Sequence, residues 1–334
     1  MVSAIEEIPA SGAAIAVGDL IGRERPVVLR GLCRDWPLVA RARQSATDFA
    51  EALARYDNGT PVDVLRMPPG ELGIIGYNAA MDGFNYQHFR VSVTQVLERL
   101  AAFSQHDEVP GLAMQSALIS SCLPDFTKVH SVSFLPTSVA PRLWIGNRVT
   151  TPAHFDSTHN LAVVVCGRRR FTLFPPEQVR NLYVGPPDFA PTAAAISMPR
   201  LSECNDARYP RLKDAMAHAQ VAELEPGDAI YIPPVWWHHV ESLAELNALV
   251  NYWWQSSAFP GHVAEPGLTA LMHAVLAFRS LPQAERAAWK LLLDHYVFSD
   301  EDPLEHLAPQ QHGVLGPLTP ALVDRLRLLS GIAR

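Results

Sequence analysis

The stretch TPAHFDSTHNLAVVVCGRRRFTLFPP, residues 151–176, decides the fold. It contains two runs of β-branched and aromatic residues, NLAVVVCG at 160–167 and RRFTLFPP at 169–176. Such runs, bounded by glycine and proline, predict short β-strands. Three further runs of this kind stand at 142–150, 228–234 and 247–254. Many short strands with this punctuation favour a sandwich, a barrel or a jelly roll.

Three side chains predict a metal site. His154 and Asp156 are two residues apart, and in an extended strand the side chains at i and i+2 point to the same face. One imidazole and one carboxylate can then reach a single ion. The best candidate for a third ligand is His238, which follows the apolar run at 228–234 and its Pro-Pro turn. Two neutral imidazoles and one carboxylate form the facial triad of non-haem Fe(II) oxygenases, which leaves positions open for a chelating co-substrate and dioxygen.

The segments on either side of this β-rich region have a different character. The N-terminal third mixes strand and helix patterns, and the last part of the chain is amphipathic and helical. We therefore divide the chain into an N-terminal α/β segment (1–110), a β core (111–260) and C-terminal helices (261–334). The predicted elements outside the core are strands at 25–32, 62–67 and 71–78, and helices at 45–56, 91–103, 268–281, 282–298 and 319–333, with Ser45 and Thr319 as N-caps.

Composition excludes several classes of function. The 334 residues carry a formal net charge of -7, with 48% hydrophobic and 18% charged residues, so no clustered basic surface for nucleic acid is expected. The four cysteines form no C-x-x-C pair, which argues against a disulfide framework or a cysteine zinc site and favours a cytoplasmic protein. We expect no membrane association, because the N-terminus lacks a basic leader and no apolar run reaches the ~20 residues that cross a bilayer.

Four strings together resemble the JmjC, or cupin-like, oxygenases that depend on Fe(II) and 2-oxoglutarate. They are residues 25–37, 151–183, 225–243 and 249–254, and the asparaginyl-hydroxylase branch with its bacterial relatives is the most similar. The resemblance implies a mainly β protein whose core is a double-stranded β-helix, with iron at one mouth and flanking α/β and helical elements. Fe(II), 2-oxoglutarate and dioxygen are the implied cofactor and co-substrates.

The resemblance also carries over to single positions of the metal site. His154 and Asp156 fall on the first two iron ligands, and His238 falls on the third because it is the first histidine of W-W-H-H. His239 is then expected to be a packed or surface histidine. His159, three residues after Asp156, is not expected to touch the metal.

The implied co-substrate pocket departs from the family at one position. Arg169 stands where the family usually has a lysine for the distal carboxylate of 2-oxoglutarate, and an arginine can pair with a carboxylate in a bidentate manner. If this segment is a strand, Arg168 and Arg170 face the opposite side and are solvated. The positions that contact the co-substrate in the family correspond to Thr151, Asn160 and Asn251, for which structural hydrogen bonds are the alternative.

The resemblance also implies which residues line the iron cavity. Trp253 matches an aromatic residue that lines the iron cavity, whereas Trp236, Trp237 and Trp254 are expected in the core. The family's tyrosine from an earlier strand has no equivalent in LAMQSALI at 112–119, where Gln115 or Ser116 is the candidate substitute. Glu241 is expected to be a surface acid rather than a partner of a ligand histidine.

The leading functional hypothesis is hydroxylation of a C–H bond in a protein or peptide side chain or in a small metabolite. Asp156 argues against the related halogenases, which lack this carboxylate. Three alternatives stay open: a JmjC-type N-demethylase, a non-catalytic cupin-type metal or ligand-binding protein, and a zinc- or manganese-dependent isomerase. The C-terminal helices predict a homodimer, although their apolar faces would also suit packing on the protein's own β core.

Overall fold

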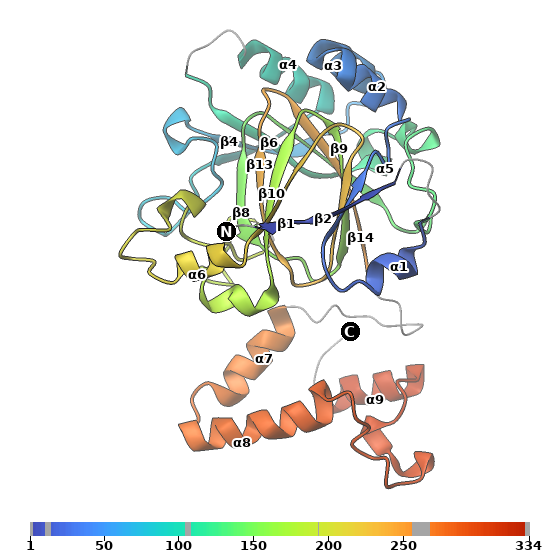
Figure 1. Ribbon diagram of the computed structural model, residues 1–334, viewed down its shortest axis with the longest axis vertical. Coiled ribbons are helices and arrows are strands. Elements are labelled where there is room, and N and C mark those ends of the chain that lie inside the picture. The colour runs from blue at the N-terminus through green and yellow to red at the C-terminus, as the bar shows by residue number, and fades with distance from the viewer. Residues whose placement is uncertain (1–2, 11–14, 104–107, 193, 256–267, 331–334) are drawn as a thin grey trace. The chain divides into compact units, whose positions relative to one another are not determined.

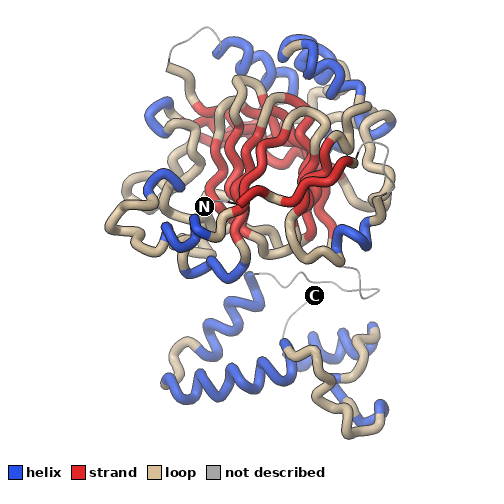
Figure 2. Tube along the Cα trace, in the orientation of Figure 1, coloured by secondary structure: helices blue, strands red, loops and turns tan. Residues whose placement is uncertain are grey.

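The computed structural model describes residues 3–10, 15–103, 108–192, 194–255 and 268–330. The chain divides into two compact units, Met1–Trp254 and Gln255–Arg334 (Figure 1). The first unit holds the described strands, and the second consists of helices and turns (Figure 2).

The first unit is built from two sheets. The five-stranded sheet runs in the order β1 (Ser3–Ala4), β11 (Gln220–Leu224), β10 (Arg169–Phe174), β13 (Trp237–Ser242) and β8 (Thr150–His154). The nine-stranded sheet runs in the order β2 (Glu6–Pro9), β3 (Val27–Arg30), β12 (Ala229–Ile232), β9 (His159–Cys166), β14 (Asn247–Trp254), β7 (Pro141–Gly146), β6 (Gly111–Leu118), β4 (Val62–Met67) and β5 (Gln87–Val91). From β7 to β14 the chain passes repeatedly between the sheets, as in a double-stranded β-helix, and the predicted jelly-roll class is confirmed.

Strand β9 explains how the core is arranged. All eight of its residues are buried, so it reads as an uninterrupted apolar run rather than an alternating one. Ala162 and Val164 belong to the apolar cluster between the two sheets, together with Phe171 and Leu173 of β10. The alternate residues Leu161, Val163 and Val165 belong to a second cluster beneath the helices. The two faces of β9 therefore pack into two different apolar clusters.

Helices cover the outer face of the large sheet. Leu38 of α2 (Pro37–Gln44), Phe49 of α3 (Ala46–Ala54) and Val96 of α4 (Val93–Phe103) are buried in the same cluster as Val163. The short helices are α1 (Val17–Ile21), α5 (Ile119–Cys122) and α6 (Leu212–Ala217), with 3-10 turns at Pro69–Glu71, Phe126–Lys128, Pro176–Arg180 and Leu201–Glu203. The long β10–β11 connection contains the last two of these turns and α6.

The predicted strand at 71–78 is wrong. This segment leaves the Pro69–Glu71 turn through left-handed residues, Leu72 at φ 54° and Gly73 at φ 71°. A Cβ on Gly73 would lie 2.2 Å from the Arg148 carbonyl oxygen, so the chain turns sharply against another backbone segment. Only isolated bridges follow, from Ile74 to Thr150 and from Tyr77 to Phe84.

The predicted strands at 62–67 and 247–254 coincide with β4 and β14, and the remaining predicted elements are found with shifted ends. The predicted N-cap of α3 is confirmed, because Ser45 Oγ accepts the Asp48 N–H at 2.9 Å. The run at 91–103 divides into the end of β5 and helix α4, and the run at 142–150 divides into β7 and the first residue of β8. Strands β1, β2, β11 and β13, and most of β5 and β8, were not among the predicted runs.

The second unit contains the three predicted C-terminal helices. They are α7 (Leu268–Phe278), α8 (Gln283–Leu293), which continues into a π-helical turn at Asp294–Phe298, and α9 (Pro320–Ser330), with 3-10 turns at Pro309–Gln311 and Gly313–Leu315. The hydroxyl of Thr319 accepts the Leu322 N–H at 3.2 Å, as its predicted capping role requires. None of the helices in the described ranges has the length and apolar character to cross a membrane.

Candidate metal centre

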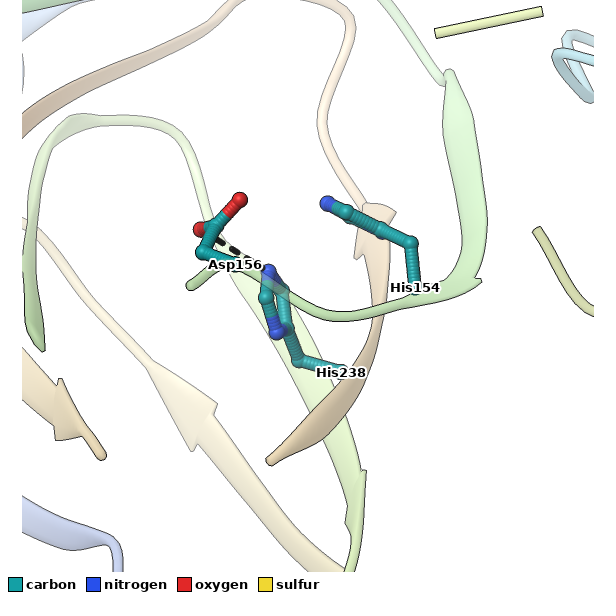
Figure 3. A group of neighbouring side chains, drawn as sticks. All are labelled: His154, Asp156 and His238. Atoms are coloured by element: carbon teal, nitrogen blue, oxygen red, sulfur yellow. Dashed lines mark ion pairs between the residues drawn. The ribbon is translucent and has the colours of Figure 1, made fainter. Parts of the chain in front are cut away.

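Two paired strands bring the predicted histidine ligands together. His154 ends β8, and its backbone is paired in register with that of His238 near the start of β13. Their ring centroids are 4.2 Å apart. Asp156 completes the group, with Oδ2 at 3.6 Å from Nε2 of His238, and one ligand atom from each residue lies within 4.8 Å of the others (Figure 3). The structure therefore gathers the three predicted ligands at one point.

Asp156 reaches this point from a loop rather than from the strand. β8 ends at His154, and the backbone carbonyl of Asp156 accepts the Val235 N–H at 2.8 Å. Val235 has φ 65°, which is unusual for a β-branched residue, in the turn that leads into β13. The alternation argument for H-x-D thus named the correct residues, but a contact between two loops holds the carboxylate in place.

Hydrogen bonds orient both imidazoles for metal binding. Nδ1 of His154 lies 2.9 Å from the Pro152 carbonyl oxygen, and Nδ1 of His238 lies 3.1 Å from that of Trp236. A carbonyl only accepts, so Nδ1 carries the proton in both rings and the lone pair on Nε2 is directed to the shared point. The pKa of His238 is lowered, mainly by burial and secondly by the nearby His154. The lowered pKa favours the neutral ring, which is the form that binds a metal.

Asp156 is oriented through one of its two oxygens. Oδ2 accepts the side-chain N–H of Asn160 at 3.1 Å and the indole N–H of Trp253 at 3.0 Å. No hydrogen bond to Oδ1 is found among the described residues, so this oxygen is available to a metal. Asn160 and Trp253 were predicted as a co-substrate contact and a cavity residue; both line the cavity, and both hydrogen-bond the predicted metal ligand Asp156.

A cavity of about 390 Å³ opens beside the three ligands. The predicted site residues all line it: Thr151, His154, Asp156, Asn160, Arg169, His238, Asn251 and Trp253. Its apolar lining includes Leu65, Phe171 and Leu249. The sequence analysis missed the part of the wall formed by β4, β5, residues 190–192 and Ala194, because no local pattern places these segments beside the metal site.

Arg169 is a buried cation in this cavity without a carboxylate partner. It is 9% exposed, its Nε has no hydrogen-bond partner, and no ion pair to it is found among the described residues. Burial lowers its pKa to about 10, so it still carries its charge at neutral pH. The neighbouring Arg170 faces the other way and pairs with Glu223 at 2.7 Å, as the predicted alternation requires. An unpaired buried charge is costly, so the site is suited to an anionic ligand.

A β-bulge brings both candidate substitutes for the family's missing tyrosine to the cavity. The pairing of β6 with β7 shifts between Met114 and Ala117, and Ser116 adopts φ 45°. As a result, both Gln115 and Ser116 line the cavity, although neighbouring residues of a regular strand would face opposite sides. Either polar side chain can contact a ligand there.

His159 and His239, the histidines nearest to the ligands in sequence, lie outside the metal site. His159 Nδ1 lies 2.8 Å from the Tyr231 hydroxyl, and its ring stacks on Trp254. His239 lines a separate cavity of about 410 Å³, between alternate residues of β8 and β13 on one side and residues of the segments 71–85 and 196–202 on the other. Glu241 forms an ion pair with Arg170 at 3.6 Å rather than contacting a ligand histidine. These positions agree with the sequence-based expectations.

A family model described as a cupin-like domain matches residues 13–258. The chain belongs to this family. Lysine-specific demethylase JMJ31 of Arabidopsis thaliana is 33% identical over 155 residues, which cover 46% of this chain and 26% of that protein. Jumonji C domain-containing protein 5 of Drosophila melanogaster is 30% identical over 162 residues, 48% of this chain and 37% of that protein. HSPB1-associated protein 1 of Homo sapiens is 34% identical over 151 residues, 43% of this chain and 30% of that protein.

In these relatives, therefore, the match spans well under two thirds of the protein. Membership of the cupin-like family, with its JmjC relatives, implies Fe(II) and 2-oxoglutarate as the groups that the site would hold. The residues fit both groups. The Nε2 lone pairs of His154 and His238 and the free oxygen of Asp156 form the donor set for Fe(II). In the same cavity, the unpaired guanidinium of Arg169 suits the distal carboxylate of 2-oxoglutarate.

Proposed function

We propose that the protein is an Fe(II)- and 2-oxoglutarate-dependent dioxygenase that hydroxylates a C–H bond. The observation that carries this proposal is the unpaired, buried guanidinium of Arg169 in the cavity that also contains the His154, Asp156 and His238 ligands. When bound, Fe(II) and 2-oxoglutarate supply the activation of dioxygen. A metal-binding protein without this co-substrate would have no use for a buried cation that costs stability.

The chain's own residues would hold each end of the co-substrate. Arg169 would pair with the distal carboxylate, and Thr151 and Gln115 or Ser116 offer further polar groups on the cavity wall. Asn251 is already engaged through Oδ1, which accepts the Trp144 indole N–H at 2.8 Å, so its amide N–H group remains to donate. Asp156 would hold the metal through Oδ1, because Oδ2 already accepts the Asn160 and Trp253 N–H groups, and a single carboxylate oxygen would leave room for the keto acid and for dioxygen.

The charge of the lining supports hydroxylation of an uncharged group over N-demethylation. Outside the metal ligands, Asp63 is the one carboxylate among the described lining residues. It is half-exposed and already contacts Nε2 of His88 at 2.9 Å and Nε of Arg90 at 3.5 Å. A methylated ammonium would therefore lose its hydration without meeting a free carboxylate, which costs several kcal/mol in a buried site. The rest of the lining, with Leu65 and Trp253, suits an aliphatic or aromatic group.

The names of two relatives nevertheless favour a demethylase as the second candidate. JMJ31 and JMJ30 of Arabidopsis thaliana are both named lysine-specific demethylases, and JMJ30 is 26% identical over 242 residues, 70% of this chain and 50% of that protein. Hydroxylation and demethylation use the same metal site. Only the product distinguishes them, because the demethylase releases formaldehyde.

Two experiments test the proposal. Anaerobic addition of Fe(II) and 2-oxoglutarate should produce a weak visible charge-transfer band, and slow succinate formation should follow in air. Absence of both in properly reconstituted protein would overturn the dioxygenase proposal and leave the binding protein or the isomerase. Incubation with cell extract, with mass spectrometry for the gain of one oxygen, should then find the substrate; stimulation by methyl-lysine peptides with formaldehyde release would select the demethylase.

A further inference from the structure

One wall of the metal cavity comes from the long β10–β11 connection. Residues 189–192, here called the cover segment, belong to no strand or helix, and three of them, Ala190, Pro191 and Thr192, line the cavity. The base of their loop is closed by a bridge from Val184 to Ser197. The loop tip therefore depends on contacts from elsewhere to keep its position.

Two tyrosine hydroxyls from a different segment supply these contacts. The hydroxyl of Tyr77 donates to the Phe189 carbonyl oxygen at 2.6 Å, and that of Tyr86 donates to the Pro191 carbonyl oxygen at 2.7 Å. Both tyrosines lie in the connection between β4 and β5, more than 100 residues away in sequence. Two carbonyl groups of the loop tip, from residues separated by Ala190, are thus held by a segment distant in sequence.

An aromatic cluster reinforces the two hydrogen bonds. The ring of Phe84 stacks on Tyr86 with centroids 5.5 Å apart, and on Phe189 with centroids 5.0 Å apart. The Tyr77 ring lies 5.7 Å from that of Phe189. The side chains of residues 190–192 are small, and of these three only Pro191 is buried. The two hydroxyls, the Phe189 ring and the buried Pro191 together hold the tip.

We propose that Tyr77 and Tyr86 are positioning residues that hold the cover segment as the outer wall of the metal cavity and so restrict which molecules reach the metal. Loops with few buried contacts open locally at small free-energy cost, so removing either hydroxyl should increase the open fraction. The consequence for access to the metal rests on the proposed function. The attachment itself does not, because it concerns the protein alone.

Limited proteolysis tests the attachment without any cofactor. Chymotrypsin can cleave after Phe189 only when this ring has left its cluster. Tyr77→Phe and Tyr86→Phe each lose one hydrogen bond while keeping the ring, and each should speed this cleavage about fivefold, with about thirtyfold for the double variant. Tyr183→Phe is the matched control, because it removes a hydroxyl of the same connection that accepts the Arg211 N–H at 3.0 Å away from the cavity lining. Unchanged cleavage in the double variant would overturn the proposal.

Stopped-flow binding tests the consequence for access. The charge-transfer band of the anaerobic Fe(II) protein reports the association and dissociation of 2-oxoglutarate. If the wall restricts access, both rate constants should rise by the same factor in the double variant, whereas the Kd should stay within twofold of the wild type. Faster cleavage with unchanged rate constants would show that ligands reach the metal elsewhere and would overturn this part. A wild-type protein without any band would instead contradict the proposed function, and the cleavage result would still stand.

Discussion

The indole Nε1 of Trp253 lies 3.0 Å from Oδ2 of Asp156, so an aromatic residue of the cavity wall also holds a metal ligand. Replacing Trp253 with Phe keeps an aromatic ring but removes this donor. We expect Fe(II) or Mn(II) to bind about tenfold more weakly, since partners that orient metal ligands typically contribute 10–100-fold to affinity. Calorimetric titration measures this effect. Trp289→Phe, in the second unit, is the control, and equal affinities in the two variants would contradict the prediction.

The buried charge of Arg169 predicts opposite effects on binding and on stability. Arg169→Met should weaken 2-oxoglutarate binding at least about thirtyfold, because losing one partner of a buried charge pair costs about 2–5 kcal/mol. Without ligand, the same variant should unfold at a higher temperature, because an uncompensated buried charge has been removed. Arg170→Met, on the opposite face of β10, should change the 2-oxoglutarate Kd less than twofold. A loss of both binding and stability would point to simple misfolding.

Gly167 allows the turn between β9 and β10 that places Arg169. It has φ 73°, and a Cβ there would lie 2.4 Å from both the Leu246 carbonyl oxygen and Oδ1 of Asn247. Gly167→Ala should therefore cost about 3 kcal/mol or more of unfolding free energy. Gly59→Ala is the control: Gly59 has φ 82° with nothing within 4 Å, so only the backbone cost of about 1 kcal/mol applies. Similar urea midpoints for the two variants would show that the close approach is unimportant.

His130 predicts a loss of stability in acid. It is fully buried, its Nδ1 donates to the Phe126 carbonyl oxygen at 2.9 Å, and its Nε2 accepts the Leu38 N–H at 3.2 Å. Burial lowers its pKa below the ordinary 6.5, so the folded state favours the neutral ring. Its contribution is complete above pH 6.5 and is lost as the pH falls through the folded-state pKa. The stability advantage of the wild type over His130→Asn should shrink between about pH 7.5 and about pH 5.5 in urea unfolding; a constant gap would contradict this.

The predicted homodimer can be tested in solution. Leu291 and Leu328, in α8 and α9, are 70% and 83% exposed, which is unusual for leucine side chains on amphipathic helices. We expect a dimer by light scattering, and we expect Leu291→Asp with Leu328→Asp to give a monomer. Leu72→Asp, at an exposed position of the first unit, should leave the mass unchanged. A monomeric wild type would contradict the prediction.

Structural features that depend on neighbouring residues could be predicted from the sequence. The apolar run of β9, the capping of α3 by Ser45 and the alternation around Arg169 all follow from neighbouring residues. The metal ligands could be named because H-x-D and the later W-W-H-H carry a family resemblance. The loop position of Asp156 could not be deduced, since it depends on a contact with Val235, 79 positions further along the chain.

Other features depend on contacts between distant segments. The run at 71–78 has the apolar character of a strand, but Gly73 packs against the Arg148 backbone and the segment has no neighbouring strand in a sheet. Tyr77 and Tyr86 carry no local signal, because their partners, Phe189 and Pro191, lie in a part of the β10–β11 connection that belongs to no helix or strand. Such contacts exist only once the sheets have formed.

The register pairing of His154 with His238 has a consequence for how this protein can change. The spacing of the two imidazoles is set by the distance between adjacent strands and not by the length of chain that joins them. Insertions and deletions in the β10–β11 connection should therefore be tolerated without loss of the ligand geometry. That connection is where a lineage could exchange one substrate preference for another, and where an engineer could graft a new recognition loop onto an unchanged reaction centre.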